Sequence, residues 1–154
     1  MMADVLIKDS GKKGKGVFAS RDFKQGELIL TIDTSATIHK DNLQYLPLEE
    51  QNHTMYIGKK KYTVMKSPER YVNHSCKPNA YLKDYALFSK RAIRKGEEIT
   101  CDYSLSSVDP WEMECNCKSK LCRHLIRGNL LQTDAAFLKI NRKYIPKWLL
   151  AEVE

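Results

Sequence analysis

The sequence contains no apolar segment of the length that a membrane span or a secretory leader requires. Its 154 residues include no uncharged apolar run near the roughly 18 residues that cross a bilayer, and residues 1–9 lack the apolar core of a signal peptide. Gly and Pro are scarce, at 7 and 5 residues, while charged residues make up 29%, which excludes collagen-like, disordered and membrane-embedded classes. We therefore expect one domain, inside a cell and without a membrane partner.

Acidic residues are outnumbered by basic ones. Lys and Arg number 26 and Asp and Glu 19, which gives a formal charge of +7. Such an excess favours an anionic partner such as nucleic acid or an acidic surface. It fits an ordinary basic domain equally well, because the surplus is spread over residues 59–61, 90–95, 118–127 and 139–147.

Cysteine is present in an odd number, five, and without a leader, which argues against a disulfide framework and favours metal ligands. Three of these residues form a C-x-C-x4-C pattern: Cys115, Cys117 and Cys122. Zinc prefers four tetrahedral ligands, and thiolates suit it. The residues alone leave the fourth ligand open among Cys76, Cys101, His74 and His124, and the alternative is three unpaired surface thiols.

Short apolar segments separated by turn residues predict a mainly β domain with a few helical turns. The tail should be helical, with Pro146 at the start of a last short helix, and residues 41–51 should form helical turns interrupted by Pro47. The expected strands cover residues 5–7, 16–19, 27–32, 60–65 as an edge strand, a hairpin of 80–82 and 85–89 around a turn at 83–84, and 98–103.

Three motifs carry candidate chemistry, and each is modest alone. Residues 14–18 (GKGVF) hold a G-x-G that fits no dinucleotide fingerprint but lets backbone approach a ligand. Residues 70–79 (RYVNHSCKPN) place a His beside a Ser, but no G-x-S-x-G elbow supports a hydrolase, so a structural turn is the simpler interpretation. Residues 95–103 (KGEEITCDY) put the phenol of Tyr103 at a strand tip, where it could equally cap the core.

The order of these motifs, followed by C-x-C-x4-C-Arg123, resembles the SET-domain family of protein-lysine methyltransferases with a post-SET zinc segment. The resemblance covers about residues 5–123, and the tail looks like the end of small, free-standing SET proteins of microbial type. It implies a β-clip-type fold of small sheets with a pseudoknot, in which residues 73–79 thread beneath the loop around residues 96–103. The implied division is a SET domain at 1–105, with a variable insert at about 40–60, and a post-SET zinc segment with a helical tail at 106–154.

The resemblance also implies the site. Tyr103 is the catalytic position, and Cys76 completes the zinc ligands with Cys115, Cys117 and Cys122. A second channel tyrosine is ambiguous among Tyr45, His53 and Tyr56, of which we favour Tyr56, while Tyr62 and Tyr85 should be packing residues. S-adenosylmethionine is implied to bind through Lys15, Gly16, Val17, Phe18, Arg70, Tyr71, Asn73, His74 and Leu125.

The implied reaction is methyl transfer from S-adenosylmethionine to a lysine amine, on a histone or another chromatin or nucleic-acid-associated protein. Weak contact with nucleic acid is a further expected interaction, and the location would be cytoplasmic in a prokaryote and nuclear in a eukaryote. Cys101 stands where many members carry Phe or Tyr, and its small side chain predicts di- and trimethylation. The alternative is an inactive, zinc-containing basic binding module, against which Tyr103, Asn73 and His74 argue.

Overall fold

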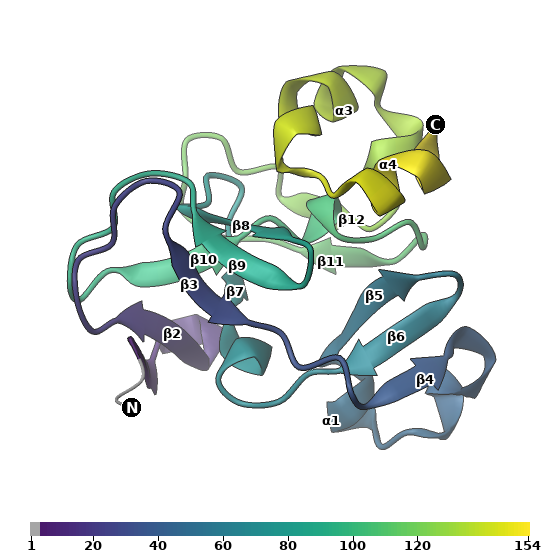
Figure 1. The fold of residues 1–154 in the computed structure, drawn as a ribbon, viewed down its shortest axis with the longest axis horizontal. Helices are drawn as coiled ribbons and strands as arrows, with labels where there is room; N and C mark the ends of the chain where they lie inside the picture. The colour runs from purple at the N-terminus through teal and green to yellow at the C-terminus, as the bar shows by residue number, and fades with distance from the viewer. Residues whose placement is uncertain (1–3) are drawn as a thin grey trace.

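The computed structural model describes residues 4–154, whose strands form four small sheets (Figure 1). The first sheet has the order β1 (Val5–Asp9), β2 (Lys15–Ala19), β10 (Glu98–Cys101), β7 (Asn73–His74). The second has the order β3 (Leu28–Thr31), β9 (Ala86–Ser89), β8 (Ala80–Lys83), and the third β4 (Thr37–His39), β6 (Lys61–Val64), β5 (Thr54–Gly58). The fourth pairs β11 (Glu112–Glu114) with β12 (Leu125–Arg127). The expected fold class, mainly β with small sheets, is confirmed.

The helices are short and gather in the insert and in the tail. Pro47 and Pro146 each stand directly before a helix, as N-cap residues whose fixed φ suits that place. No helix within residues 4–154 has the length and apolar character to cross a membrane. The α-helices are α1 (Leu48–Gln51), α2 (Leu130–Thr133), α3 (Ala135–Asn141) and α4 (Lys147–Val153), and the 3-10 helices are η1 (Gly11–Lys13), η2 (Lys40–Tyr45), η3 (Glu69–Tyr71), η4 (Tyr103–Leu105) and η5 (Arg142–Tyr144).

Two hydrophobic clusters hold these elements together. The first lies among the sheets of β2, β10 and β9, where Val17, Leu87 and Ile99 are almost completely buried. The second fixes the C-terminal tail to the insert and to η4, and its buried members are Tyr56, Tyr62, Leu105, Leu131, Ile145 and Leu149. The tail therefore packs against the rest of the fold, and Figure 1 shows it above β12.

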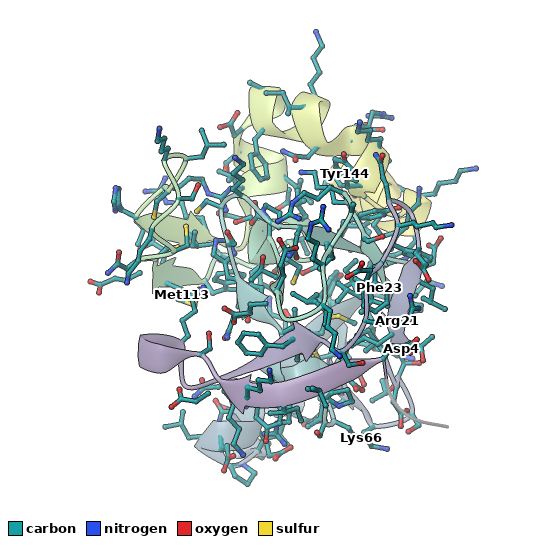
Figure 2. The ribbon with its side chains drawn as sticks, turned by 90° about the vertical axis from the view of Figure 1, so that its left-hand side faces the viewer. Asp4, Arg21, Phe23, Lys66, Met113 and Tyr144 are labelled. Atoms are coloured by element: carbon teal, nitrogen blue, oxygen red, sulfur yellow. The ribbon has the colours of Figure 1, made fainter. Side chains whose placement is uncertain are left out.

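A charged side chain covers one edge of the first cluster. The Arg21 guanidinium lies 4.1 Å from the centre of the Phe23 ring and 3.1 Å from the Asp4 carboxylate (Figure 2). Glu27 pairs with the same guanidinium at 2.7 Å. These contacts close the turn that leads out of β2 over a buried aromatic ring.

Three local predictions were wrong. Residues 60–65 were expected at a sheet edge, but β6 lies in the middle of its sheet, because Thr63 is fully buried and pairs with β4 as well as β5. The hairpin turns at Asp84 and Tyr85 rather than at 83–84, since both residues have positive φ, of 50° and 61°, as a two-residue type I′ turn requires. The strand expected to run to residue 103 ends at Cys101.

Candidate active site

Parallel pairing of β7 with β10 brings the second and third sequence motifs together. Thr100 faces Asn73 and Cys101 faces His74 across this short ladder. The Asn79 side chain extends the contact, because its Nδ2 donates to the Glu98 carbonyl at 2.8 Å and its Oδ1 accepts from the Thr100 N–H at 2.9 Å. Residues 73–79 therefore run beside β10, which is the adjacency that the expected knot needs.

Tyr103 begins the 3-10 turn η4 directly after this ladder. Asp102 caps the turn, since its carboxylate accepts a hydrogen bond from the Ser104 N–H at 3.0 Å. The Tyr103 hydroxyl donates to the Val72 carbonyl at 2.5 Å. Burial raises the pKa of the phenol well above its ordinary value, with a smaller contribution from Cys101 and Glu98. The phenol therefore remains protonated in the neutral range.

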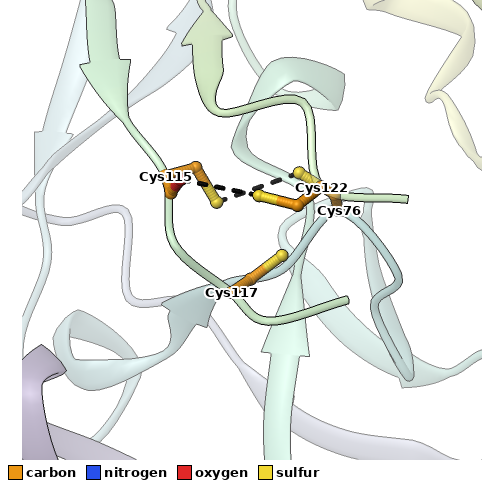
Figure 3. A group of neighbouring side chains, drawn as sticks. All are labelled: Cys76, Cys115, Cys117 and Cys122. Atoms are coloured by element: carbon orange, nitrogen blue, oxygen red, sulfur yellow. Dashed lines mark hydrogen bonds between the residues drawn. The ribbon is translucent and has the colours of Figure 1, made fainter. Parts of the chain in front are cut away.

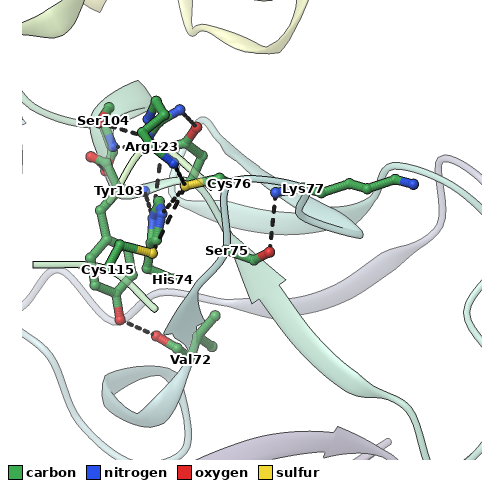
Figure 4. A network of polar contacts seen from close by, with 11 residues as sticks. Val72, His74, Ser75, Cys76, Lys77, Tyr103, Ser104, Cys115 and Arg123 are labelled. Carbon is green, nitrogen blue, oxygen red and sulfur yellow. Dashed lines mark hydrogen bonds and ion pairs between the residues drawn. The ribbon is translucent and has the colours of Figure 1, made fainter. Parts of the chain in front are cut away.

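His74 lies against Tyr103 and is only 6% exposed. Its Nδ1 accepts a hydrogen bond from the Tyr103 backbone N–H at 3.1 Å, and its Nε2 lies 3.4 Å from the Cys76 sulfur (Figure 4). Burial lowers the pKa of the imidazole to about 4, against the opposing field of Asp102, so the ring is neutral. Both ring nitrogens are thus engaged within the protein.

Four cysteine sulfurs form a compact cluster, which joins the segment after β7 to the loop between β11 and β12 (Figure 3). The Sγ atoms of Cys76, Cys115, Cys117 and Cys122 all lie within 4.8 Å of one another. Tetrahedral zinc with Zn–S bonds of about 2.3 Å places sulfurs about 3.8 Å apart, and the Cys76–Cys115 separation is 3.9 Å. The donor set and its size therefore fit a structural zinc ion.

The thiols of this cluster differ in acidity. Burial raises the pKa of Cys115 to about 12. Burial also opposes ionisation of Cys117, but backbone N–H groups of Cys76 and Ser119 lower its pKa to about 6. Four adjacent thiolates need a cation to offset their charge, which a divalent metal provides. Of the other candidates for the fourth ligand, Cys101 lies outside the cluster and burial raises its pKa to about 12.

His124 also lies outside the four-sulfur group, although its Nδ1 is 3.8 Å from the Cys122 sulfur. Its φ of 61° is in the left-handed region that favours glycine.

A second group of residues lies close together near Asn73 of β7. Its members are Lys15, Gly16, Tyr71 and Asn73. The Asn73 side chain donates to the Lys15 carbonyl at 3.0 Å and to Glu98 Oε1 at 2.8 Å. A Cβ on Gly16 would lie 2.5 Å from that same Glu98 oxygen, so a larger residue here would displace the Glu98 carboxylate from its present position. The exposed Lys15 ammonium lies 5.1 Å from the centre of the Tyr71 ring, where it can receive an anionic group.

The remaining residues expected to bind the cofactor occupy different surroundings. Arg70 lies 3.2 Å from His53 Nδ1 and near two acidic side chains of α1. Val17 is fully buried in the first cluster, and its backbone lies between β1 and β10 in the sheet. Phe18 lies beneath the Lys8 ammonium at 5.6 Å. Leu125, 39% exposed, lines a surface hollow with Glu114, Cys115, Asn116, Arg123 and His124.

Tyr56, our candidate for the second channel tyrosine, belongs to the second hydrophobic cluster. Its hydroxyl donates to Glu152 Oε2 at 2.6 Å, and burial raises the pKa of its phenol to about 12. Its ring packs edge-on against Tyr62 at 5.3 Å. Tyr85 stacks on Trp148 at 5.9 Å, consistent with the packing role expected for it. A channel role for Tyr56 stays a prediction.

Sequence reasoning missed one central interaction, the pairing of Arg123 with Asp102. The guanidinium donates to both carboxylate oxygens, at 2.7 and 2.8 Å, and to Ser104 Oγ at 3.2 Å. The Arg123 side chain also stacks over the Phe137 ring at 5.1 Å. One arginine thus joins the cysteine cluster, η4 and the tail. Asp102 and Arg123 each belong to a motif described above, but nothing in the sequence of either motif indicates that the two side chains pair.

The family comparison agrees with this geometry. The SET domain model matches residues 14–104, and the chain belongs to the SET-domain family. Among curated proteins it is similar to the histone-lysine N-methyltransferases, H3 lysine-36 specific, of Eremothecium gossypii and Debaryomyces hansenii. Identity is 30% over 152 residues for the first and 31% over 153 for the second, and each alignment covers 88% of this chain. The chain spans only about a fifth of these relatives, 22% and 21%.

Solved structures show the same fold. The methyltransferase domain of human histone-lysine N-methyltransferase SETMAR superimposes with a TM-score of 0.65, over 82% of this chain and 58% of that one. Sequence identity between the two is 17%, so this likeness concerns the fold alone.

Proposed function

We propose that this protein is an S-adenosylmethionine-dependent protein-lysine N-methyltransferase that acts on a histone or another chromatin protein. Membership of the SET family and the activity for which the relatives are named support the reaction class and the substrate class. The observation that carries the proposal is the position of Tyr103. Its hydroxyl is fixed on the Val72 carbonyl, directly before β7, where β7 pairs with β10.

The chemical difficulty of the reaction lies in the substrate. A free lysine has a pKa of about 10.4, so at pH 7 only about one in 2,500 is neutral, and deprotonation costs roughly 4.6 kcal/mol. S-adenosylmethionine supplies an electrophilic methyl group on a positively charged sulfonium. A buried channel disfavours the ammonium form of the lysine and lowers this cost.

Tyr103 would position the amine and would not remove its proton. Its own hydroxyl proton is directed to the Val72 carbonyl, which leaves the phenolic oxygen free to accept from the amine N–H. The raised pKa keeps the phenol neutral, so it is a poor base. Correct alignment of the amine with the methyl group then provides much of the rate, because it removes the entropy cost of bringing the two reactants together.

Residues beside β7 would hold the cofactor. The Lys15 ammonium suits a carboxylate, and the Tyr71 ring lies beside it. Gly16, Val17 and Phe18 stay in the proposed set, although β1 and β10 flank the backbone of β2. Because both nitrogens of the His74 ring are engaged within the protein, its contribution would come from the backbone. Arg70, Asn73 and Leu125 complete the proposed set, of which Leu125 would approach from the post-SET segment.

Zinc would be held by Cys76, Cys115, Cys117 and Cys122. This ion would tie residues 106–154 to the knot of residues 1–105, the division that we propose for the chain. The surplus positive charge repels a free basic peptide and favours a substrate already bound to nucleic acid. A chromatin substrate places the protein in the nucleus if the source is eukaryotic.

The test is transfer of an isotope-labelled methyl group to core histones, nucleosomes and a lysate of the source organism. Tyr103→Phe removes only the hydroxyl and should reduce transfer by at least about 100-fold, the scale of losing a positioned polar group in a reaction. Tyr81→Phe, at a ring that packs between Phe88 and Tyr144, is the matched control and should stay near wild type. Near-normal transfer by Tyr103→Phe would refute the assignment.

The competing function, an inactive zinc-containing binding module, makes a different prediction. Such a module need not bind S-adenosylmethionine, so calorimetry separates the two. Saturable binding that weakens in Lys15→Ala supports the enzyme, and no binding by zinc-loaded protein supports the module.

A further inference from the structure

Cys76 is the one proposed metal ligand that lies beside β7, and two nitrogen atoms lie close to its sulfur. His74 Nε2 is 3.4 Å away, and the Arg123 backbone N–H donates to the same sulfur at 3.3 Å (Figure 4). N–H donors of this kind strengthen when the sulfur is an ionised metal ligand, because the bond becomes charge-assisted.

The tautomer of His74 follows from its other neighbour. A backbone N–H can only donate, and that of Tyr103 is directed at Nδ1 from 3.1 Å. Nδ1 must therefore carry a lone pair, which places the proton of the neutral ring on Nε2. That proton faces the Cys76 sulfur. The opposite tautomer has no comparable partner, because Asp102 Oδ1 is 3.7 Å from Nδ1, beyond hydrogen-bond length.

We infer that His74 is a positioning residue that links the Cys76 thiolate of the metal centre to the backbone of Tyr103 through its two ring nitrogens. The chain of contacts runs from the sulfur to Nε2–H, across the ring to Nδ1, and on to the N–H of Tyr103. Its catalytic consequence rests on the proposed function, whereas the hydrogen bonds themselves do not.

Arg123 provides a second connection between the Cys76 sulfur and η4. Arg123 contacts the Cys76 sulfur through its backbone and clamps Asp102, the residue before Tyr103, through its guanidinium. The Cys76 sulfur is therefore linked to Asp102 and to Tyr103, the two consecutive residues at the start of η4. Occupancy of the metal site should thus determine how firmly Tyr103 is held, in addition to how stable the post-SET segment is.

Two substitutions of His74 separate the hydrogen bond to the Cys76 sulfur from the hydrogen bond to the Tyr103 backbone. Asn places an amide oxygen near the position of Nδ1, so His74→Asn keeps an acceptor for the Tyr103 N–H but loses the donor to sulfur. Gln places an amide N–H near the position of Nε2, so His74→Gln keeps the donor to sulfur but loses that acceptor. The measurements are zinc retention against a chelator, the amide resonance of Tyr103 and the kinetics of methyl transfer.

We expect His74→Asn to weaken zinc retention by about 10-fold or more, the usual effect of losing a hydrogen bond to a metal ligand. His74→Gln should retain zinc better, while the Tyr103 amide shifts and kcat falls more than KM changes. Equal effects of the two variants on all three readouts would overturn the inference.

The wild-type protein gives a test that needs no variant. The 15N shifts of the His74 ring in zinc-loaded protein should show the proton on Nε2, and a proton on Nδ1 would overturn the inference. These readouts do not require turnover. If the expected tautomer and zinc effects appear but no substrate is methylated, the proposed function fails and the structural link stands.

Discussion

Replacing Arg123 by methionine should destabilise the protein strongly, because it leaves a buried carboxylate without its cation. The Asp102 side chain is 5% exposed and the Arg123 side chain 24%, and their two hydrogen bonds are 2.7 and 2.8 Å long. Removing one partner of a buried pair costs about 3–5 kcal/mol. Because Asp102 keeps its bond from the Ser104 N–H and the arginine is partly solvated, we expect a loss of about 2–3 kcal/mol for Arg123→Met.

The assay is urea unfolding at a fixed, saturating zinc concentration. Arg127→Met is the matched control, since Arg127 pairs with Glu112 at 3.3 Å while both side chains are more than half exposed, at 54% and 58%. An exposed pair contributes at most about 1 kcal/mol. A double variant with Asp102→Asn should recover part of the loss, because no unpaired charge remains buried. A loss in Arg123→Met no larger than that in the control would refute the reasoning.

The remaining predictions concern packing, product and pH. Gly58→Ala should reduce the free energy of unfolding by at least about 1 kcal/mol more than Gly26→Ala. Both glycines have positive φ, but among residues 4–154 only a Cβ on Gly58 would meet a neighbour, the Trp148 ring at 3.1 Å. Thermal unfolding of the two variants compares them. Cys101→Tyr should shift the product toward one methyl group, which intact mass after long incubation would show; a wild type that stalls at one methyl contradicts the premise. The Tyr103→Phe rate should fall by the same factor at every pH from 7 to about 9.5, because the raised pKa keeps the wild-type phenol protonated throughout this range. If the loss of rate changes with pH instead, Tyr103 acts as a base and the positioning role is refuted.

Local features of the fold could be predicted from sequence because neighbouring residues determine them. Pro146 indicates a helix start, Pro47 indicates a break between helical turns, and the segment of residues 80–89 has the pattern of a hairpin. The central place of β6 could not be predicted, because it depends on pairing with β4 across more than twenty residues. The end of β10 was misplaced because the Asp102 side chain caps a turn there, and capping depends on how the chain is already folded.

The site likewise has features that local sequence predicts and features that depend on contacts between distant residues. The cysteine spacing indicated a metal site, yet the choice of Cys76 over His124 came only from the family resemblance. The engagement of the His74 ring could not be predicted from sequence, because it depends on the position of Tyr103, 29 residues away. The pairing of Arg123 with Asp102 likewise joins two motifs 21 residues apart.

The most direct test of the central claim is to locate the transferred methyl group. The zinc-loaded protein would be incubated with nucleosomes and S-adenosylmethionine that carries a deuterated methyl group, and the products would be sequenced by tandem mass spectrometry. We predict deuterated methyl on the side-chain nitrogen of a histone lysine with wild type, and at least 100-fold less with Tyr103→Phe. Deuterated methyl on another residue type, or equal labelling by both proteins, would contradict the account.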